Sequence, residues 1–241
     1  MITLVTVTYN AASTIERTME SVAIQTCKDY EHLVIDGASK DNTVDIARRY
    51  NATVVSEPDK GLYDAMNKAL RLAKGDYICY LNAGDKLHSK DTLAHIAAMA
   101  QKDKVGVIYG DTDIVDDNGV KLHSRRLTPP EHLTWRSFKN GMLVCHQSFY
   151  INKEIAQTYD LTYRFSADFD WCIRSMKEGE RRGMQNVYIH EPLSDYLNEG
   201  MTTANHKASL KERFRIMVKH YGLVSTVLHH LWFIIRLMVK G

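Results

Sequence analysis

The carboxylate of Asp85 is the first side chain of this sequence whose setting indicates chemistry. It follows an apolar and aromatic run over residues 77–81, which is typical of a strand buried on both faces, and a short polar turn over residues 82–84. In open α/β sheets, ligands bind beyond the carboxyl ends of the strands. A carboxylate placed there can hold a hard divalent cation together with phosphate oxygens. The alternative role for Asp85 is to cap a following helix.

Asp168 is the second candidate, and it opens a predicted helix that carries Asp170 in the same first turn. A positioned carboxylate can remove the proton of an attacking hydroxyl group, and such a general base typically contributes about 10²–10⁴-fold in rate. Asp170 is the alternative base. Both carboxylates would also stabilise the helix N-terminus through its dipole, which needs no catalytic role. The residue types alone leave these roles open.

The elements that must position these carboxylates form an alternating pattern in residues 1–85. Strands are predicted at residues 2–7, 32–35, 53–55 and 77–81, with helical periodicity between them. Such alternation indicates an α/β fold, in which a parallel sheet has helices on both faces. Polar residues follow every strand, so we expect them to gather along one edge of the sheet as a crevice of nucleotide size. These residues are Thr8, Tyr9, Asn10, Asp36, 57–61 and 82–85.

Several functional classes are disfavoured by what the sequence lacks. No G-x-G-x-x-G follows the first strand and no Walker A motif occurs, so phosphates would be held by a metal and isolated side chains. Lys and Arg total 31 against 29 for Asp and Glu, and this near balance argues against nucleic-acid binding. The four cysteines are far apart in the sequence and form no C-x-x-C pair. This spacing argues against a zinc site and is consistent with a reducing compartment. The first residues resemble a strand and not a signal peptide.

Four ordered motifs, at residues 5–10, 34–43, 56–68 and 81–85, resemble the family 2 glycosyltransferases, which have the GT-A fold. The resemblance extends from Thr3 to about Thr203, and the third motif is similar to a subgroup from bacterial O-antigen, capsule and exopolysaccharide clusters. It implies a GT-A domain over residues 1–205. It also implies an inverting transfer of a sugar from a nucleotide sugar, for which we expect UDP, to a lipid-linked glycan.

At matching positions, the resemblance implies a base, a metal ligand and a set of donor contacts. Asp168 matches the catalytic base, in the pattern Asp-x-Asp-Trp-x-x-Arg that begins there, although Ala167 replaces the Glu that commonly precedes it. Asp85 matches the metal-binding carboxylate of the Asp-x-Asp motif, in which Ala83 replaces the first acid; the expected cation is Mn²⁺ or Mg²⁺. The donor contacts are Thr8, Tyr9 and Asp36 at a uracil base, Lys60 and Asn67 at the diphosphate or ribose, and Asn10 and Asn82 beside them.

The second half of the chain carries weaker signals. We expect a hairpin turn at residues 116–119, a helix that opens at 128–131, a strand at 145–150 and a loop over the donor at 200–203. His146 is expected to be a buried histidine with satisfied hydrogen bonds, and lining the site is its alternative role. Trp171 is expected in the core, and stacking on an acceptor sugar is its alternative role.

Residues 206–241 are predicted to form a separate helical tail. The segment 223–240 has a broad apolar arc and a narrow polar stripe of Ser225, His229, Arg236 and Lys240. A basic amphipathic helix suits a membrane interface with anionic lipids. It would place the enzyme on the cytoplasmic face of the membrane, beside a lipid-linked acceptor. The alternative is that the helix packs on the catalytic domain or in a dimer.

Three rival functions remain at this level. A processive polysaccharide synthase would carry a Gln-x-x-Arg-Trp motif and membrane-spanning helices, and neither is evident in the sequence. A nucleotidyltransferase would carry a basic, Gly-rich loop after the first strand, where residues 8–12 offer neither feature. A non-catalytic sugar-binding or scaffold protein is supported by the altered motif at residues 82–85. The sequence sets no oligomeric state.

Overall fold

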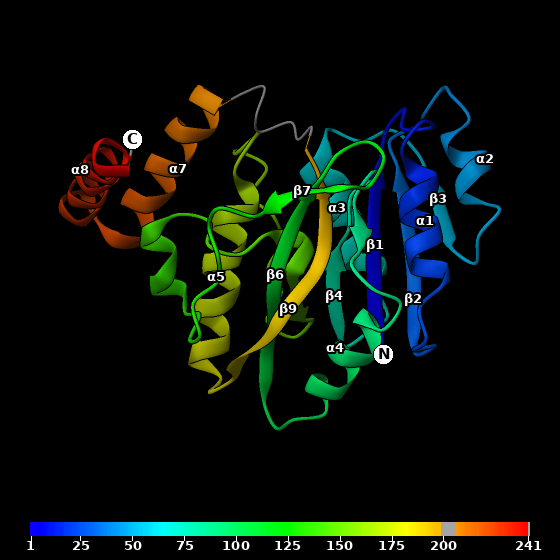
Figure 1. Ribbon diagram of the computed structural model, residues 1–241, viewed down its shortest axis with the longest axis horizontal. Coiled ribbons are helices and arrows are strands. Elements are labelled where there is room, and N and C mark those ends of the chain that lie inside the picture. Colours follow the sequence, from blue (N-terminus) through cyan, green and yellow to red (C-terminus); the bar gives the residue numbers. More distant parts are fainter. Residues whose placement is uncertain (199–205, 241) are drawn as a thin grey trace.

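A computed structural model describes residues 1–198 and 206–240, so the loop expected at 200–203 lies outside the described residues. A mixed sheet runs through the centre of the molecule, with helices on both faces (Figure 1). Its strand order is β3-β2-β1-β4-β8-β6-β9-β5, and β7 pairs with β6. The strands are β1 (Ile2–Thr8), β2 (Tyr30–Asp36), β3 (Thr53–Ser56), β4 (Tyr77–Tyr80), β5 (Lys86–Leu87), β6 (Val105–Val115), β7 (Lys121–Ser124), β8 (Phe149–Asn152) and β9 (Gln185–Leu197).

The helices cover the two faces of the sheet because side chains alternate along each strand. Val5 and Val7 of β1 pack into a core shared with α3, α5, η1 and α7, whereas Leu4 packs on the opposite face with residues of α1 and α4. The helices are α1 (Ile15–Ala23), α2 (Thr43–Ala47), α3 (Leu62–Leu72), α4 (Thr92–Ala100), α5 (Ala167–Arg181), α7 (His206–Tyr221) and α8 (Leu223–Lys240), with short 3₁₀ helices η1 (Trp135–Asn140) and η2 (His146–Ser148).

The predicted gathering of polar turns along one sheet edge is confirmed. Strands β1, β2, β3 and β4 pair in parallel, and Thr8, Asp36 and Ser56 are neighbours in register at their carboxyl ends. The turns that follow are bonded to one another: the amide of Gly37 donates to the Thr8 carbonyl at 2.9 Å, and the amide of Ala83 donates to the Val7 carbonyl at 3.4 Å. One edge of the sheet therefore carries all four turns.

Two local predictions in the second half are wrong. The expected strand at 145–150 begins only at Phe149, because the Ser148 amide donates to the Cys145 carbonyl at 3.0 Å and closes the 3₁₀ turn of η2. The helix expected to open at 128–131 begins instead at Trp135. The hydroxyl group of Tyr109 accepts the Leu133 amide at 3.0 Å, which holds that stretch against the sheet. The hairpin turn at 116–119 is confirmed.

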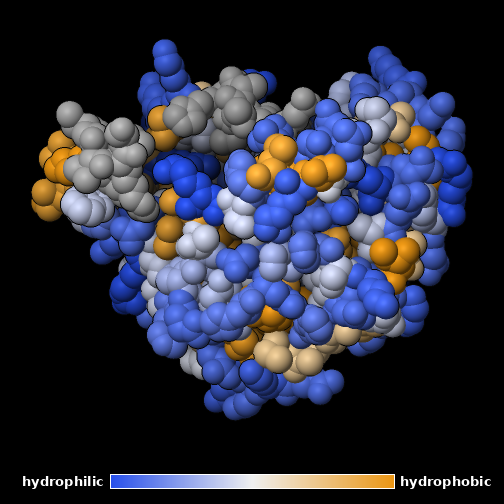
Figure 2. Space-filling view, in the orientation of Figure 1, coloured by the Kyte–Doolittle hydropathy of each residue, from blue (hydrophilic) through white to orange (hydrophobic). Residues whose placement is uncertain are grey.

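The two C-terminal helices differ in how they contact the body of the protein. Ile216 and Met217 of α7 are buried in the main core, so α7 packs directly on the domain. Gly222 separates the helices with a φ of +80°, which favours glycine. Helix α8 lies at the left edge of the molecule, where Figure 2 shows apolar side chains at the surface. Within residues 1–198 and 206–240, none of the helices combines the length and apolar character needed to cross a membrane.

Candidate active site

Asp168 lies in the first turn of α5, and its side chain is 15% exposed. One carboxylate oxygen accepts the hydroxyl of Tyr63 at 3.2 Å, and the other lies 3.7 Å from Nδ1 of His146. Burial would raise the pKa of Asp168, but the neighbouring imidazole of His146 and the charge of Arg213 outweigh it and hold that pKa below its usual value. Asp168 is thus a partly open carboxylate that stays ionised, as a general base requires.

Asp170 has a different environment, although it lies only two residues away. Its carboxylate is fully buried and accepts Nε of Arg174 at 2.5 Å and Nε2 of His220 at 2.8 Å, with Nζ of Lys219 at 3.3 Å. Burial would raise its pKa, but the contacts with His220 and Arg174 lower it strongly. Asp170 therefore binds α5 to α7, and among these two carboxylates only Asp168 is open to a substrate. Trp171 is 1% exposed and lies in the core, as expected.

Asp85 lies just after β4 and is 4% exposed. Its two oxygens accept Nε2 of Gln147 at 2.7 Å and the amide of Leu197 at 2.9 Å. Both donors are neutral, so burial dominates and raises the pKa of Asp85 to about 6. Among the described residues no cation is bonded to this carboxylate, and a buried carboxylate of that kind with an elevated pKa is a suitable place for a positive ligand.

Asn82 begins the turn that ends at Asp85. Its backbone carbonyl accepts the Asp85 amide at 3.0 Å, and its side-chain nitrogen lies 3.2 Å from Nε2 of His146. The side-chain Oδ1 of Asn82 is buried and has no hydrogen-bond partner in the described part of the chain. A carboxylate and an amide oxygen are the hard ligands that Mg²⁺ and Mn²⁺ accept. The residues present therefore fit the divalent cation expected from the sequence.

The dipeptide His146–Gln147 joins the two candidate carboxylates. His146 contacts Asp168 through Nδ1 and Asn82 through Nε2, while Gln147 donates to Asp85. The sequence alone predicts a buried histidine with satisfied hydrogen bonds at position 146 and indicates no role for Gln147. The signal that could have found them is a pair of adjacent polar residues before a buried strand, but their directions depend on the 3₁₀ turn of η2.

The residues after β1 form a compact turn with the turn after β2. The Oγ1 atom of Thr8 is buried without a partner in residues 1–198 and 206–240, and the ring of Tyr9 is 62% exposed beside Gly37. Asn10 accepts the Lys40 amide at 2.9 Å and donates its own amide to Ser39 at 2.8 Å. An unpartnered buried hydroxyl next to an exposed aromatic ring suits a flat, polar ligand such as a nucleotide base.

Asp36 ends β2 and is fully buried. Its carboxylate accepts the amide and the hydroxyl of Ser39 and also the hydroxyl of Ser56, the last at 2.6 Å. These bonds connect the turns after β2 and β3. The structure thus gives Asp36 a role in holding the edge of the sheet together, and its contact with uracil stays a prediction.

Lys60 and Asn67 lie on either side of the start of α3 and have unlike surroundings. The side chain of Lys60 is exposed, and its amide donates to Asp64 at 3.0 Å. Asn67 is buried, and its amide group both donates to the Tyr159 carbonyl at 3.0 Å and accepts the Tyr159 amide at 2.7 Å. Lys60 is therefore free to reach a diphosphate. Asn67 holds the chain at Tyr159, and its predicted contact with the donor stays a prediction.

A separate group of His88, Asp113 and Asp195 brings its ligand atoms within 4.8 Å of one another, an arrangement that could hold a metal ion. Its carboxylates already have cationic partners: Lys86 lies 3.2 Å from Asp195, and Lys121 lies 2.8 Å from Asp113. His88 itself contacts Asp195 at 2.6 Å. The buried acids are thus neutralised within the protein, unlike Asp85, whose bonded donors are neutral.

Known structures share this fold. S. aureus TarS in complex with UDP aligns with a TM-score of 0.68 at 14% identity, covering 90% of this chain and 65% of that one. Glucosyl-3-phosphoglycerate synthase from Mycobacterium tuberculosis, in complex with Mn²⁺, UDP and glucosyl-3-phosphoglycerate, aligns with a TM-score of 0.65 at 14% identity, covering 92% and 80%. At this identity, the likeness shows the fold alone, which is the GT-A fold expected from the sequence.

The proteins that are similar to this chain in sequence are glycosyltransferases. A PGL/p-HBAD biosynthesis glycosyltransferase of Mycobacterium tuberculosis is 31% identical over 209 residues, covering 81% of this chain and 76% of its own length. The amylovoran biosynthesis glycosyltransferase AmsB of Erwinia amylovora is 28% identical over 206 residues, covering 78% and 66%. The family model described as glycosyl transferase family 2 matches residues 3–159. This chain belongs to glycosyl transferase family 2.

Proposed function

We propose that this protein is an inverting glycosyltransferase that moves one sugar from a UDP-sugar to a lipid-linked glycan during surface polysaccharide synthesis. The observation that carries the proposal is the environment of Asp168, an ionised carboxylate that is partly open and faces a second, buried carboxylate site through His146. The coarse activity follows from family membership. The donor, the acceptor and the stereochemistry are our inference.

The transfer is a single displacement at the anomeric carbon of the donor sugar. The acceptor oxygen forms a bond to that carbon, its proton passes to the carboxylate of Asp168, and the bond from carbon to the β-phosphate oxygen breaks with its electrons leaving on UDP. One base and one displacement invert the configuration. Tyr63 and His146 keep the carboxylate of Asp168 in place and ionised before it takes the proton.

Asp85 and Oδ1 of Asn82 would hold the divalent cation, which when bound supplies Lewis-acid stabilisation of negative charge on the leaving diphosphate. The side chain of Lys60 is exposed and could approach the same phosphates. Thr8 and Tyr9 would contact the base, and Asp36 would do so at the end of β2. TarS and glucosyl-3-phosphoglycerate synthase are themselves solved with UDP, which supports this choice of nucleotide.

The lipid-linked acceptor and a position on the cytoplasmic face of the membrane are further parts of this proposal. They are supported by α8, which exposes Leu223, Val224, Val227, Leu228, Leu231, Trp232 and Ile235. The helix contains no acidic residue, as the sequence over 223–240 shows. An apolar face on a helix without negative charge suits an anionic lipid surface.

The first experiment measures thermal stabilisation of the purified chain by UDP, GDP, dTDP and CMP, each with Mn²⁺ and with EDTA. A ligand that binds only the native state raises Tm, and we expect a Mn²⁺-dependent rise with UDP. Release of UDP from a panel of UDP-sugars is then measured with a lipid extract as acceptor source. Asp168→Asn should reduce release by about 10²–10⁴-fold and keep the UDP shift.

The matched control is Glu180→Gln, an exposed carboxylate on the same helix, which should leave both readouts unchanged. Nucleotide binding without any transfer in the wild type would favour the sugar-binding or scaffold protein. Transfer that persists in Asp168→Asn would refute the assignment of the base.

A further inference from the structure

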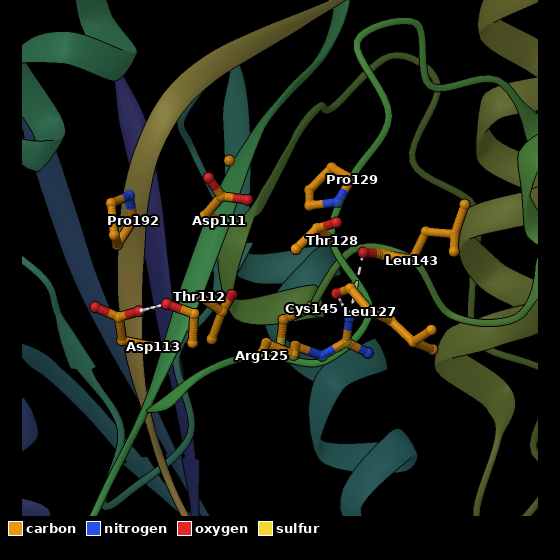
Figure 3. Close-up of a pocket in the computed structure, with 12 residues that line it drawn as sticks. Asp111, Thr112, Asp113, Arg125, Leu127, Thr128, Pro129, Leu143, Cys145 and Pro192 are labelled. Atoms are coloured by element: carbon orange, nitrogen blue, oxygen red, sulfur yellow. Dashed lines mark hydrogen bonds between the residues drawn. The ribbon is translucent and has the colours of Figure 1, made fainter. Parts of the chain in front are cut away.

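A pocket beside the active site contains none of the residues assigned to the donor, the cation or the base. It lies between β6 and the segments 125–129 and 143–145, and its volume is about 200 Å³ (Figure 3). That volume corresponds to about seven waters at about 30 Å³ each. It is below the roughly 300–1,000 Å³ of clefts that take drug-sized ligands. The pocket therefore has room for a single sugar ring but not for a nucleotide.

Asp111 provides a fixed carboxylate at this pocket. The hydroxyl group of Tyr188 lies 2.9 and 3.0 Å from its two oxygens, and the Tyr188 ring stacks on Tyr109 with centroids 5.2 Å apart. In Figure 3 the carboxylate points toward Thr128 and Pro129 across the pocket. A carboxylate has about four acceptor positions, so Asp111 can still accept hydroxyl groups of a ligand in charge-assisted bonds.

The facing wall is held in place by Arg125. Its guanidinium donates to the carbonyls of Leu127 at 2.7 Å, Leu143 at 3.2 Å and Met142 at 2.6 Å. These bonds tie the segments 125–129 and 143–145 together, as Figure 3 shows for two of them. Apolar groups complete the lining, contributed by Leu127, Pro129, Leu143 and Pro192. A carboxylate opposite an apolar wall matches a sugar, which has hydroxyl groups around its rim and C–H groups on its faces.

Cys145 connects the pocket to the active site. It lines the pocket, and its thiol donates to Oε1 of Gln147 at 2.7 Å, whose amide nitrogen in turn donates to Asp85. The next residue, His146, contacts Asp168. Burial raises the pKa of the Cys145 thiol, and the charges of Arg125, Asp85 and Asp168 are all close enough to shift it. The pocket therefore lies next to both carboxylates.

We propose that this pocket binds the terminal sugar of the acceptor, with its hydroxyl groups on Asp111 and an apolar face against Leu127 and Pro129. This proposal rests on the proposed function. The turns after β1, β2 and β4, to which the donor is assigned, contribute no residue to this lining. An acceptor sugar seated on the β6 side would therefore approach Asp168 from a different direction than the donor.

The test uses a panel of p-nitrophenyl monosaccharides as acceptor mimics, measured by saturation-transfer NMR with the full chain in the presence of UDP and Mn²⁺. The same samples give the UDP-induced Tm shift. The variants are Asp111→Asn, which keeps an oxygen for Tyr188, and Tyr188→Phe, which keeps the stack on Tyr109. Asp103→Asn is the matched control, because Asp103 is exposed just before β6, at the far end of that strand.

At least one glycoside should bind the wild type and Asp103→Asn equally. Its affinity should fall about tenfold or more in Asp111→Asn and several-fold in Tyr188→Phe, with the UDP shift unchanged in both. Equal glycoside affinity in Asp111→Asn, or no glycoside bound by a wild type that binds UDP, would overturn the acceptor subsite and leave the proposed function standing. If the two variants change the Tm shift that a UDP-sugar induces but not the shift that UDP induces, the pocket would be assigned to the donor sugar instead.

Discussion

Nδ1 of His146 lies 3.7 Å from an oxygen of Asp168, and on its other side Nε2 lies 3.2 Å from the side chain of Asn82. One imidazole thus stands between the candidate base and the turn that carries the candidate metal site. Its effect on Asp168 opposes that of burial, because the neighbouring imidazole lowers the pKa that burial would raise. His146 is therefore a positioning residue, which keeps the base ionised.

Replacing His146 should change the pH dependence of transfer. In His146→Gln, burial acts on Asp168 with less opposition, so its pKa rises and the base is protonated at higher pH. The acid limb of kcat/KM against pH should therefore move to higher pH, while the UDP-induced Tm shift stays the same. The control is His123→Gln, an exposed histidine on β7. An unchanged acid limb in His146→Gln would contradict this role.

Removing the charge of Asp85 should stabilise the metal-free protein at neutral pH. Burial raises the pKa of Asp85 to about 6 from 3.8, so folding favours the protonated form. The stability linked to this group is fully present below about pH 3.8 and is lost as pH rises through about 6. Asp85→Asn should therefore exceed the wild type in free energy of unfolding by about 3 kcal/mol at pH 7.5.

The difference should shrink at pH 5, where the wild-type carboxyl is largely protonated. Urea denaturation at both pH values in EDTA measures it, and Asp117→Asn, in the exposed hairpin turn, is the control. With Mn²⁺ and UDP added, only the wild type should gain stability. A variant that is less stable than the wild type at pH 7.5 would show that burial does not penalise this charge.

Replacing Asp170 should weaken the fold and not only the activity. Its carboxylate is fully buried with Arg174, Lys219 and His220 around it, and His220 is itself buried. Asp170→Asn leaves Arg174 and Lys219 without their anion, which should cost on the order of 3 kcal/mol of unfolding free energy. Urea denaturation at pH 7 measures the loss. Glu180→Gln, an exposed acid on the same helix, should leave the unfolding free energy nearly unchanged, and equal effects of the two would argue against the α5–α7 contact.

Helix α8 should bind anionic membranes. The double variant Leu228→Glu and Trp232→Glu places two charges on its exposed apolar face and should reduce co-sedimentation with phosphatidylglycerol vesicles at least several-fold. The matched control places the same two charges on the exposed apolar residues of the hairpin, Val120→Glu and Leu122→Glu. Equal loss in both variants would indicate a general charge effect. Vesicle binding unchanged by the α8 variant, with a dimer that dissociates, would assign the helix to subunit contact.

The elements in the first half could be predicted because their determinants are local. Apolar runs such as 77–81 and polar turns after each strand are read directly from neighbouring residues, and parallel pairing then brings Thr8, Asp36 and Asp85 to one edge. The candidate carboxylates Asp85 and Asp168 could be named for the same reason, since each belongs to a recognisable short motif.

The α/β alternation, the family motifs and the identity of two carboxylates are therefore encoded locally in the sequence. Which acid is open depends on packing between distant segments, because Asp168 and Asp170 differ in the helices and loops that pack against them. The same holds for Asn67, whose partner is Tyr159, far along the chain. The directions of His146 and Gln147 also depend on a 3₁₀ turn that no local apolar pattern specifies. These features depend on contacts between residues that are distant in sequence. Such contacts produce no periodic pattern of apolar residues from which they could be predicted.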